Sequence, residues 1–504
     1  MSADTSVIAT LEPSKGKSVT TTATQPHGSR GTGRNARYAL LLISLIWPAQ
    51  LLSVIGLLAG NAQAQIAIHF QTTQIAWFSL SAALVGTFLM PFVVKAADLF
   101  GKRRVMIIVT ATGLVGDLLA ALAPNYALLL TGKALSGIYL SMGALVFAIA
   151  RDVFPRGLVG PASGMIGGAV GLVALGGPFL SGWLLDHHGF RGVLWFLVAA
   201  TAVSLLMLAL FVPESPVRNP NRTFDWSGGL LLGGGLTAVL YGVGKGSSWG
   251  WTDPATLAFL FGGVLALVAF LIVEVTVSEP MFQPSLLRRR EVWSVIAVTA
   301  LLSGTVLTAG TITQLLALMP PIPTASDGLG YTATRMAVIG APASVIILVA
   351  AALTGFLARR IDTRLLLAVA ASATVAGYLL MAQYHYTPSQ LAVTGTVVAV
   401  GIGIAAALAP IMIIEAVRPH EQALANGMQG MVQGIVTAVV TQVIFLVMAR
   451  GGTVLQGTQF YRDAGYRNAF YFVAGLAVVV LISIVLIPRI KRLDEAEVGE
   501  AAIA

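Results

Sequence analysis

The sequence consists largely of apolar runs of about 20 residues, separated by short clusters of charged residues. Each run is long enough to cross about 30 Å of hydrocarbon as an α-helix. Only 10% of the residues are charged, whereas a soluble globular protein has about 25%. So few charges could not cover a large water-facing surface. The sequence therefore predicts an all-α membrane protein.

The apolar runs group as six, two and six. The first six lie at 38–58, 75–95, 105–123, 127–149, 160–184 and 192–212, the next two at 228–247 and 255–277, and the last six at 292–316, 333–358, 364–383, 388–412, 424–449 and 469–489. This grouping predicts a disordered cytoplasmic tail over 1–37, a six-helix half over 38–212, a linker with two extra helices over 213–291, a second six-helix half over 292–489 and a cytoplasmic tail over 490–504.

The basic residues are distributed unevenly among the loops. Of the 30 Lys and Arg residues, only six fall in the loops on one side: Arg191, Lys245, Arg335, Arg450, Arg462 and Arg467. Lys133 falls inside a span, and the others lie in the terminal segments and the alternate loops. The positive-inside rule then predicts that both termini are cytoplasmic, in a bacterial inner membrane. Because orientation explains the net charge of +9, we expect the lipid bilayer and not a nucleic acid as partner.

The sequence lacks the residues or motifs that several kinds of protein chemistry require. There is no cysteine, which excludes a disulfide framework, a thiolate metal site and a cysteine nucleophile. No Gly-x-x-x-x-Gly-Lys-Ser/Thr loop for ATP is present. A membrane enzyme acting on a lipid-linked substrate would need clustered Asp, Glu or His near a membrane face, and His187 and His188 have only Asp186 beside them. We expect no enzyme, no cofactor and no metal.

Two loops of similar composition follow the second and tenth predicted helices. The first runs from Ala97 to Arg104 and the second from Gly355 to Arg364. Their acid, glycine and basic residues predict gating loops at the cytoplasmic ends of neighbouring helices, with Asp98, Gly101, Lys102, Arg103, Arg359 and Asp362 as the candidate residues. Two parallel halves with a site between them at mid-membrane are typical of an alternating-access transporter.

The first of these loops resembles the signature Gly-x-Leu-Ala-Asp-x-x-Gly-Arg-Lys of the major facilitator superfamily. Asp98, Gly101, Lys102 and Arg103 match it, and Val94 stands where the family has its leading Gly. The fifth helix, with Gly171, Gly177 and Pro178, resembles the Gly-Pro motif of the family's exporters. Small residues also serve ordinary close packing of membrane helices, so the motif favours export only moderately.

The segments Asp186–Arg191 and Gly330–Thr334 look like those of the fourteen-helix drug:proton antiporter family, and the resemblance extends over 38–489. It implies a major facilitator fold and a monomer that exports a small-molecule substrate, namely drugs or other amphipathic compounds, by alternating access in exchange for protons. It leaves a periplasmic adaptor protein open as a further partner.

The sequence departs from this family in two helices. The first helix lacks the family's acidic residue, because Leu52–Asn61 has no ionisable side chain. The fourth helix has Lys133 where the family has Arg, and Lys can lose its proton when it is desolvated. Asp117 and Lys133 each lie about eight residues from Asn125, which predicts a buried pair at similar depth on antiparallel helices. Either the pair titrates during transport or it is a static structural contact.

Uncharged polar residues recur at helical spacing in three predicted helices. These candidate cavity residues are Asn426, Gln429, Gln433 and Thr437 in the thirteenth helix, Thr308, Thr311 and Gln314 in the ninth, and Ser136 and Tyr139 in the fourth. Beside Met428 and Met431, they would suit a weakly specified amphipathic ligand. Hydrogen bonding between helices is the alternative. Because the first helix is uncharged, a facilitator without proton coupling also stays open.

Overall fold

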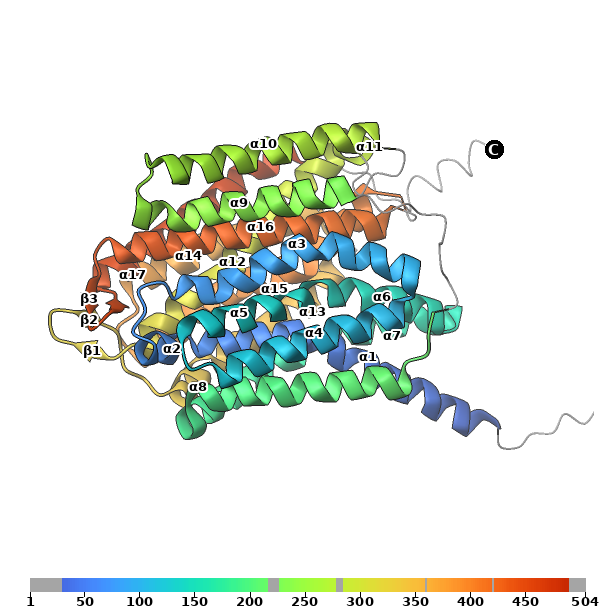
Figure 1. Cartoon of the computed structure of the whole chain (residues 1–504), viewed down its shortest axis with the longest axis horizontal. Helices are drawn as coiled ribbons and strands as arrows, with labels where there is room; N and C mark the ends of the chain where they lie inside the picture. The colour runs from blue at the N-terminus through green and yellow to red at the C-terminus, as the bar shows by residue number, and fades with distance from the viewer. Residues whose placement is uncertain (1–29, 216–225, 278–283, 359, 419–420, 489–504) are drawn as a thin grey trace, which may run out of the picture.

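A computed structural model describes residues 30–215, 226–277, 284–358, 360–418 and 421–488, and this part of the chain is almost wholly helical (Figure 1). Its α-helices are α1 (Arg30–Asn61), α2 (Gln63–His69), α3 (Ala76–Phe100), α4 (Lys102–Leu122), α5 (Tyr126–Ser136), α6 (Met142–Val153), α7 (Arg156–Gly168), α8 (Val170–Phe211), α9 (Trp226–Trp249), α10 (Pro254–Thr276), α11 (Pro284–Leu287), α12 (Arg290–Leu318), α13 (Ala333–Leu357), α14 (Thr363–Gln383), α15 (Pro388–Ala416), α16 (Gln422–Ala449) and α17 (Asp463–Ser483). Two 3₁₀ helices span Gly137–Ser141 and Ile484–Leu486. Two short hairpins are formed by β1 (Pro321–Ile322) with β2 (Ser326–Asp327) and by β3 (Thr453–Leu455) with β4 (Thr458–Phe460).

Within the described residues, twelve helical stretches are long and apolar enough to cross a membrane, and the bent helix α3 brings the number to thirteen. One of the twelve, Ala162–Phe211, contains a non-helical residue, Gly189, with φ 65° and ψ −172°. At 1.5 Å per residue an unbroken helix of this length would measure about 75 Å, more than twice the hydrocarbon thickness. The stretch therefore makes two crossings, and the prediction of an all-α membrane protein with about fourteen spans is confirmed.

Two predicted elements differ in detail from the structure. Helix α1 begins at Arg30, within the tail predicted over 1–37, because the polar residues before the first apolar run continue its helix. The fourth predicted helix is interrupted by the 3₁₀ turn at Gly137–Ser141. Gly137 lies so close to α3 that an added Cβ would be 2.1 Å from the carbonyl oxygen of Ala82. The tails over 1–29 and 489–504 lie outside the described residues.

Helices α9 and α10 lie along one side of the bundle, beside α3 and α16 (Figure 1). Gly233 of α9 packs on Phe88 of α3, and the amide nitrogen of Gln442 on α16 donates to the carbonyl oxygen of Gly244 on α9 at 3.3 Å. The outward face of α10 is apolar and exposed, with Phe261 at 70%, as expected of a lipid-facing surface. The inserted helices thus cover the seam between α3 and α16.

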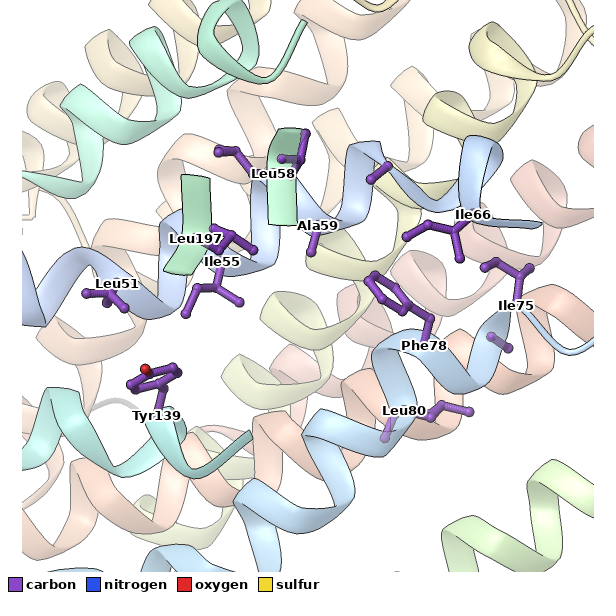
Figure 2. Packing of buried hydrophobic residues seen from close by; sticks show 14 of the residues in the cluster. Leu51, Ile55, Leu58, Ala59, Ile66, Ile75, Phe78, Leu80, Tyr139 and Leu197 are labelled. Carbon is purple, nitrogen blue, oxygen red and sulfur yellow. The ribbon is translucent and has the colours of Figure 1, made fainter. Parts of the chain in front are cut away.

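The interior of the bundle is closely packed and apolar. In Figure 2, Leu51, Ile55 and Leu58 of α1 lie one turn apart, and Leu197 of α8 lies beside them. Their i, i+4 and i+7 spacing keeps one face of α1 against its neighbours. This packing leaves the polar side chains described below as exceptions that need partners.

Candidate functional site

The two ends of the bundle differ. Both hairpins lie at one end and α1 begins at the other (Figure 1); we call these the hairpin end and the terminal end. The candidate gating loop that begins at Gly101 lies at the terminal end, because α3 runs from the hairpin end to that loop.

The glycines of the first part of α8 lie where the two halves meet. An added Cβ at Gly171 would lie 2.6 Å from Leu348 of α13, and one at Gly182 would lie 2.8 Å from the backbone of Thr334, also on α13. A Cβ at Gly177 would lie 3.2 Å from Leu57 of α1. The Gly-Pro helix therefore allows close approach of helices on both of its sides.

A cavity of about 120 Å³ lies between the same helices. Its lining comes from α1, α8, α12 and α13: Asn61, Pro178, Gln314, Leu318, Ala333, Met336, Ala337, Gly340 and Ser344. Carboxamides therefore reach it from both halves, Asn61 from α1 and Gln314 from α12. The Asn61 amide nitrogen donates to the Ser181 hydroxyl at 3.2 Å, and the group retains further donor and acceptor capacity for a ligand.

Asp186, three residues before the non-helical Gly189 of α8, contacts the cavity-lining residue Ala333. Its two carboxylate oxygens accept the backbone N–H groups of Ala333 at 2.9 Å and Thr334 at 2.8 Å. These are the first two residues of α13, so a carboxylate of the N-terminal half caps a helix of the C-terminal half. This contact can form only while the two halves are together at this point.

The β3–β4 hairpin makes a second link between the halves. The Thr458 hydroxyl donates to the carbonyl oxygen of Ala67 on α2 at 3.3 Å. The backbone N–H of Gln459 donates to the carbonyl oxygen of Thr72 at 3.5 Å. The hairpin belongs to the connection between α16 and α17, whereas α2 follows α1. Neither this hairpin nor its contacts were predicted, since short polar loops carry no periodic pattern.

The first candidate gating loop is hydrogen-bonded to an acidic residue, Glu214, that was not predicted from the sequence. Gly101 has φ 105°, a conformation that favours glycine. The Glu214 carboxylate accepts the backbone N–H groups of Arg103 at 3.0 Å and Arg104 at 3.3 Å. The Arg103 guanidinium donates to the carbonyl oxygen of Ala209 near the end of α8, at 2.5 Å. Glu214 thus caps α4, and Arg103 compensates the end of α8.

Lys102 is buried in the same loop and forms an ion pair with Asp152, which lies in the last turn of α6. The Ser215 hydroxyl also donates to Asp152, at 2.6 Å. The loop is therefore joined to the connection after α8 and to the end of α6, all within the N-terminal half. Asp98 is half-buried in the last turn of α3.

The second gating loop has corresponding contacts. Asp362 caps α14 by accepting the N–H of Arg364 at 2.9 Å, and the Arg364 guanidinium donates to the carbonyl oxygen of Ile484 at 3.4 Å. Arg364 thus meets the end of the last span as Arg103 meets the end of the sixth. Nearby, Arg289 and Glu421 form a two-bond ion pair at 3.0 and 3.2 Å. Arg359 lies outside the described residues.

Asp117 and Lys133 are both buried, at 4% and 6% exposure, as the predicted pair requires, and their charges interact, but without a direct ion pair. Each Asp117 oxygen is bound by a hydroxyl, from Ser136 at 2.6 Å and from Thr201 at 2.7 Å. The Lys133 ammonium lies over the ring of Phe78, 5.4 Å from its centroid. Among the described residues, no ion pair within 4.0 Å joins the two charges, because the hydroxyls of α5 and α8 occupy the carboxylate.

Most of the other predicted cavity residues make hydrogen bonds within their own helix or to a neighbouring one. Gln429 donates to Gln433 at 3.0 Å, and the Thr437 hydroxyl donates to the carbonyl oxygen of Gln433 at 2.8 Å. Further bonds run from Asn426 to Gln422 and from Thr308 to Gly304 and Thr437. Thr311 is half-buried on α12, and Tyr139 is buried with its hydroxyl 3.5 Å from the carbonyl oxygen of Thr110. Of the predicted set, Gln314 lines the cavity described above.

These features agree with a comparison to known families. The family model described as Major Facilitator Superfamily matches residues 39–441, which is most of the chain. The chain belongs to the major facilitator superfamily.

Proteins similar to this chain are named for different transport activities. The chain is 25% identical over 366 residues to "Uncharacterized MFS-type transporter YhcA" of Bacillus subtilis, covering 71% of this chain and 65% of that protein. It is 26% identical to the "Tetracenomycin C resistance and export protein" of Streptomyces glaucescens, over 48% of this chain and 47% of that one. It is 28% identical to the "Uridine/deoxyuridine transporter" of Lactococcus lactis, over 64% and 68%. The chain thus spans about half to two thirds of the length of the first two.

Solved structures share the fold. A POT family transporter in complex with 5-aminolevulinic acid aligns with a TM-score of 0.64 and 15% identity, over 89% of this chain and 95% of that one. The human organic anion transporter MFSD10 aligns with a TM-score of 0.53 and 17% identity, over 89% and 99%. These relatives and neighbours are transporters and not enzymes.

Proposed function

We propose that this protein is a secondary transporter that exports small amphipathic compounds by alternating access, in exchange for protons. The observation that carries the proposal is the cavity lined from both halves, together with the contacts that join the halves at the hairpin end, namely the Asp186 cap and the β3–β4 hairpin. A cavity with the two halves joined at one end is what one state of such a cycle requires.

The cavity lining supports an uncharged or weakly polar substrate. Leu318, Met336 and Ala337 supply apolar surface, while Asn61 and Gln314 supply hydrogen bonds. Adaptable apolar side chains with a few amides suit ligands of varied shape. Because about 120 Å³ is below the roughly 300 Å³ of a drug-sized site, the closed state would hold a small compound or one end of a larger one. The relative named for tetracenomycin C export supports this substrate class.

The same proposal assigns proton exchange to Asp117 and Lys133. The first-helix segment Leu52–Asn61 has no ionisable residue, so another group must carry the proton. Lys133 is buried against Phe78 without a direct ion pair to Asp117 among the described residues. A desolvated ammonium of this kind can release its proton, which a guanidinium in practice cannot.

Orientation and setting belong to the proposal as well. The clusters of Arg103, Arg104 and Arg288–Arg290 lie in loops of the terminal end, which the positive-inside rule assigns to the cytoplasm. The hairpin end would then be the outer face of a bacterial inner membrane. The transporter would act as a monomer, and export would need no further chain unless a periplasmic adaptor binds this face.

The test is transport of fluorescent cationic and neutral drugs in proteoliposomes, with and without an imposed pH gradient. Gradient-driven accumulation supports proton exchange. In Lys133→Arg, gradient-driven accumulation should be lost while substrate counterflow continues, because the charge is kept but cannot be released. Lys245→Arg, at the hairpin end of α9, is the matched control and should behave like the wild type.

Two outcomes would contradict the coupling. If Lys133→Arg and Asp117→Asn accumulate drug like the wild type, these residues do not carry the proton. If wild-type movement ignores the gradient, the protein is a facilitator or uses another driving force, a second candidate that the uncharged first helix favours. Absence of any drug movement would contradict export of this substrate class.

A further inference from the structure

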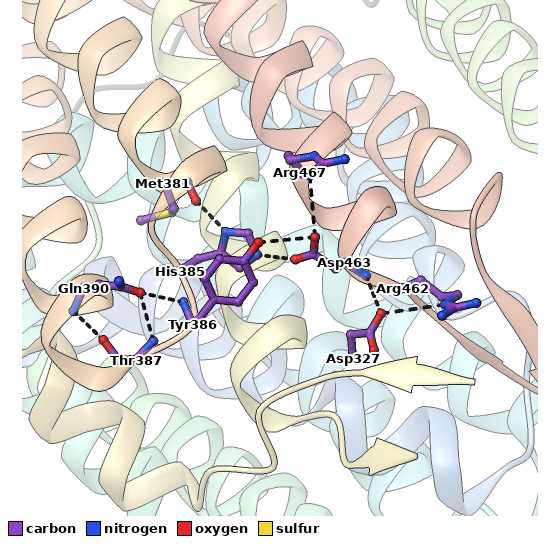
Figure 3. Close-up of polar contacts among 9 residues, drawn as sticks. All are labelled: Asp327, Met381, His385, Tyr386, Thr387, Gln390, Arg462, Asp463 and Arg467. Carbon is purple, nitrogen blue, oxygen red and sulfur yellow. Dashed lines mark hydrogen bonds and ion pairs between the residues drawn. The ribbon is translucent and has the colours of Figure 1, made fainter. Parts of the chain in front are cut away.

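A polar cluster at the hairpin end lies outside the cavity and plays no part in the transport proposal (Figure 3). His385 follows the last turn of α14, and Asp463 is the first residue of α17. Asp327 of β2, Arg462 and Arg467 surround them. The cluster therefore joins two spans of the C-terminal half to both hairpin connections.

The two ring nitrogens of His385 both face oxygen atoms. Nδ1 lies 2.7 Å from the carbonyl oxygen of Met381, and Nε2 lies 2.7 Å from Oδ1 of Asp463. A carbonyl oxygen can only accept, so Nδ1 carries a hydrogen. An ionised carboxylate also only accepts, so the contact at Nε2 needs one more proton, either on the ring or on Asp463.

Burial makes this proton necessary. The His385 side chain is 1% exposed, and Phe470 packs on its ring with centroids 5.8 Å apart. Without the extra proton, the lone pair of Nε2 would face the carboxylate at 2.7 Å, and the buried ring nitrogen would have no donor, although the Asp463 side chain is 30% exposed. Two acceptors that face each other in this way cost free energy and move apart.

The groups around Asp463 keep the second oxygen in place. The Arg467 guanidinium lies 3.9 Å from Oδ2, and the Tyr386 hydroxyl donates to it at 3.4 Å. Partial burial, and then the Asp463 carboxylate, raise the pKa of Tyr386, so this hydroxyl stays a donor. Other titratable groups of the packed elements are Asp327, Arg462, Tyr378, Tyr384, Tyr461, Tyr466 and Tyr471.

The cluster is connected to the hairpin that closes the halves. The backbone N–H of Asp463 donates to the Asp327 carboxylate at 2.9 Å, and that of Asp327 donates to the carbonyl oxygen of Tyr461 at 3.2 Å. Tyr461 directly follows β4, whose Thr458 and Gln459 contact the N-terminal half. The position of Asp463 therefore fixes the base of the β3–β4 hairpin.

We propose that His385 and Asp463 form a proton-binding site at the hairpin end, and that the proton held there keeps the β3–β4 hairpin seated across the two halves. At acid pH the proton is bound and the end is closed. At alkaline pH the proton leaves, the Nε2 contact opens and the hairpin loosens at its base. If the hairpin end faces outward, as the proposed function requires, external protons favour closure of the outer face.

The experiment uses the full-length protein, which has no cysteine of its own. Spin labels are attached at Thr73→Cys, next to the hairpin's contact on the N-terminal half, and at Leu455→Cys on β3; both positions are exposed. Distances are measured from about pH 5 to about pH 8, the range in which imidazoles titrate. We expect one short distance at acid pH and a growing longer-distance population as the pH rises.

Two variants should remove the pH response in opposite directions. In Asp463→Asn the amide can donate to the neutral Nε2, so the short distance should persist throughout. In His385→Ala the contact is missing, so the longer distance should already be populated at acid pH. His188→Gln, an exposed histidine at the same end, is the control and should titrate like the wild type.

The proposal is overturned if the labelled wild type shows no change over this range, or if both variants keep its pH response. Because the distances need no substrate and no gradient, this outcome is separate from any failure of the transport assay. If only one variant loses the pH response, and the other keeps the wild-type distances at both acid and alkaline pH, a site shared by the two residues is also contradicted.

Discussion

The clearest prediction concerns Asp186, whose carboxylate joins the two halves. In Asp186→Ala the N–H groups of Ala333 and Thr334 lose both acceptors, at 2.9 and 2.8 Å. Bonds to a charged acceptor contribute about 1.5–3 kcal/mol each, and because Asp186 is exposed we take about 1 kcal/mol for each. The closed state should lose about 2 kcal/mol, which raises the open fraction about 30-fold. Asp186→Asn keeps one acceptor and should raise it about 5-fold.

The assay measures access to the cavity from the hairpin end. Ser344 lines the cavity and, in this cysteine-free chain, Ser344→Cys provides a single thiol. Its labelling rate with a membrane-impermeant thiol reagent, applied to the outer face of cells, is proportional to the open fraction. The two Asp186 variants should increase this rate in the stated order.

Asp253→Asn is the matched control. Asp253 also caps a helix, α10, by accepting the N–H of Ala255 at 2.8 Å, but this contact lies within the inserted helices. Its labelling rate should equal that of the parent. A rate increase below about twofold in Asp186→Ala, equivalent to about 0.4 kcal/mol, would refute the reasoning that this carboxylate holds the end closed.

Three further predictions concern stability and closure. Gly101→Ala should lower the thermal unfolding temperature in detergent, because φ 105° costs a residue with a Cβ about 1–2 kcal/mol and Glu214 would lie 2.9 Å from the new atom. Gly182→Ala should raise labelling from the hairpin end, since its Cβ would meet the Thr334 backbone at 2.8 Å, while Gly176→Ala, with open space, should not. Glu214→Gln should lower thermal stability by about 1 kcal/mol; an unchanged melting curve would contradict its capping role.

The sequence alone established which segments cross the membrane. Each span depends on about 20 consecutive residues, and the cost of burying charge or unpaired backbone in lipid leaves few alternatives to a helix. The candidate gating loops could be located from the sequence, because the Asp98 to Arg103 pattern is contiguous. The Gly-Pro segment around Pro178 could be located in the same way, and its glycines lie close to neighbouring helices.

The partners of individual polar groups could not be predicted in this way. Asp117 and Lys133 were expected to be buried and both are, but rise per residue says nothing about the direction of a side chain. The hydroxyls of Ser136 and Thr201 reach the carboxylate first. The polar residues of α16 are candidates for the cavity, and bonds such as that from Gln429 to Gln433 pair some of their polar atoms along their own helix, which periodicity alone does not reveal.

Only the tertiary structure decided which distant residues meet. Asp186 and Ala333 are 147 positions apart, His385 and Asp463 are 78 apart, and Arg103 and Glu214 are 111 apart. Whether a hydrophobic run crosses the bilayer depends on its own length and composition, so the local sequence is enough to predict the span. A carboxylate takes whichever donor the packed helices bring within hydrogen-bond distance, and that depends on the whole fold.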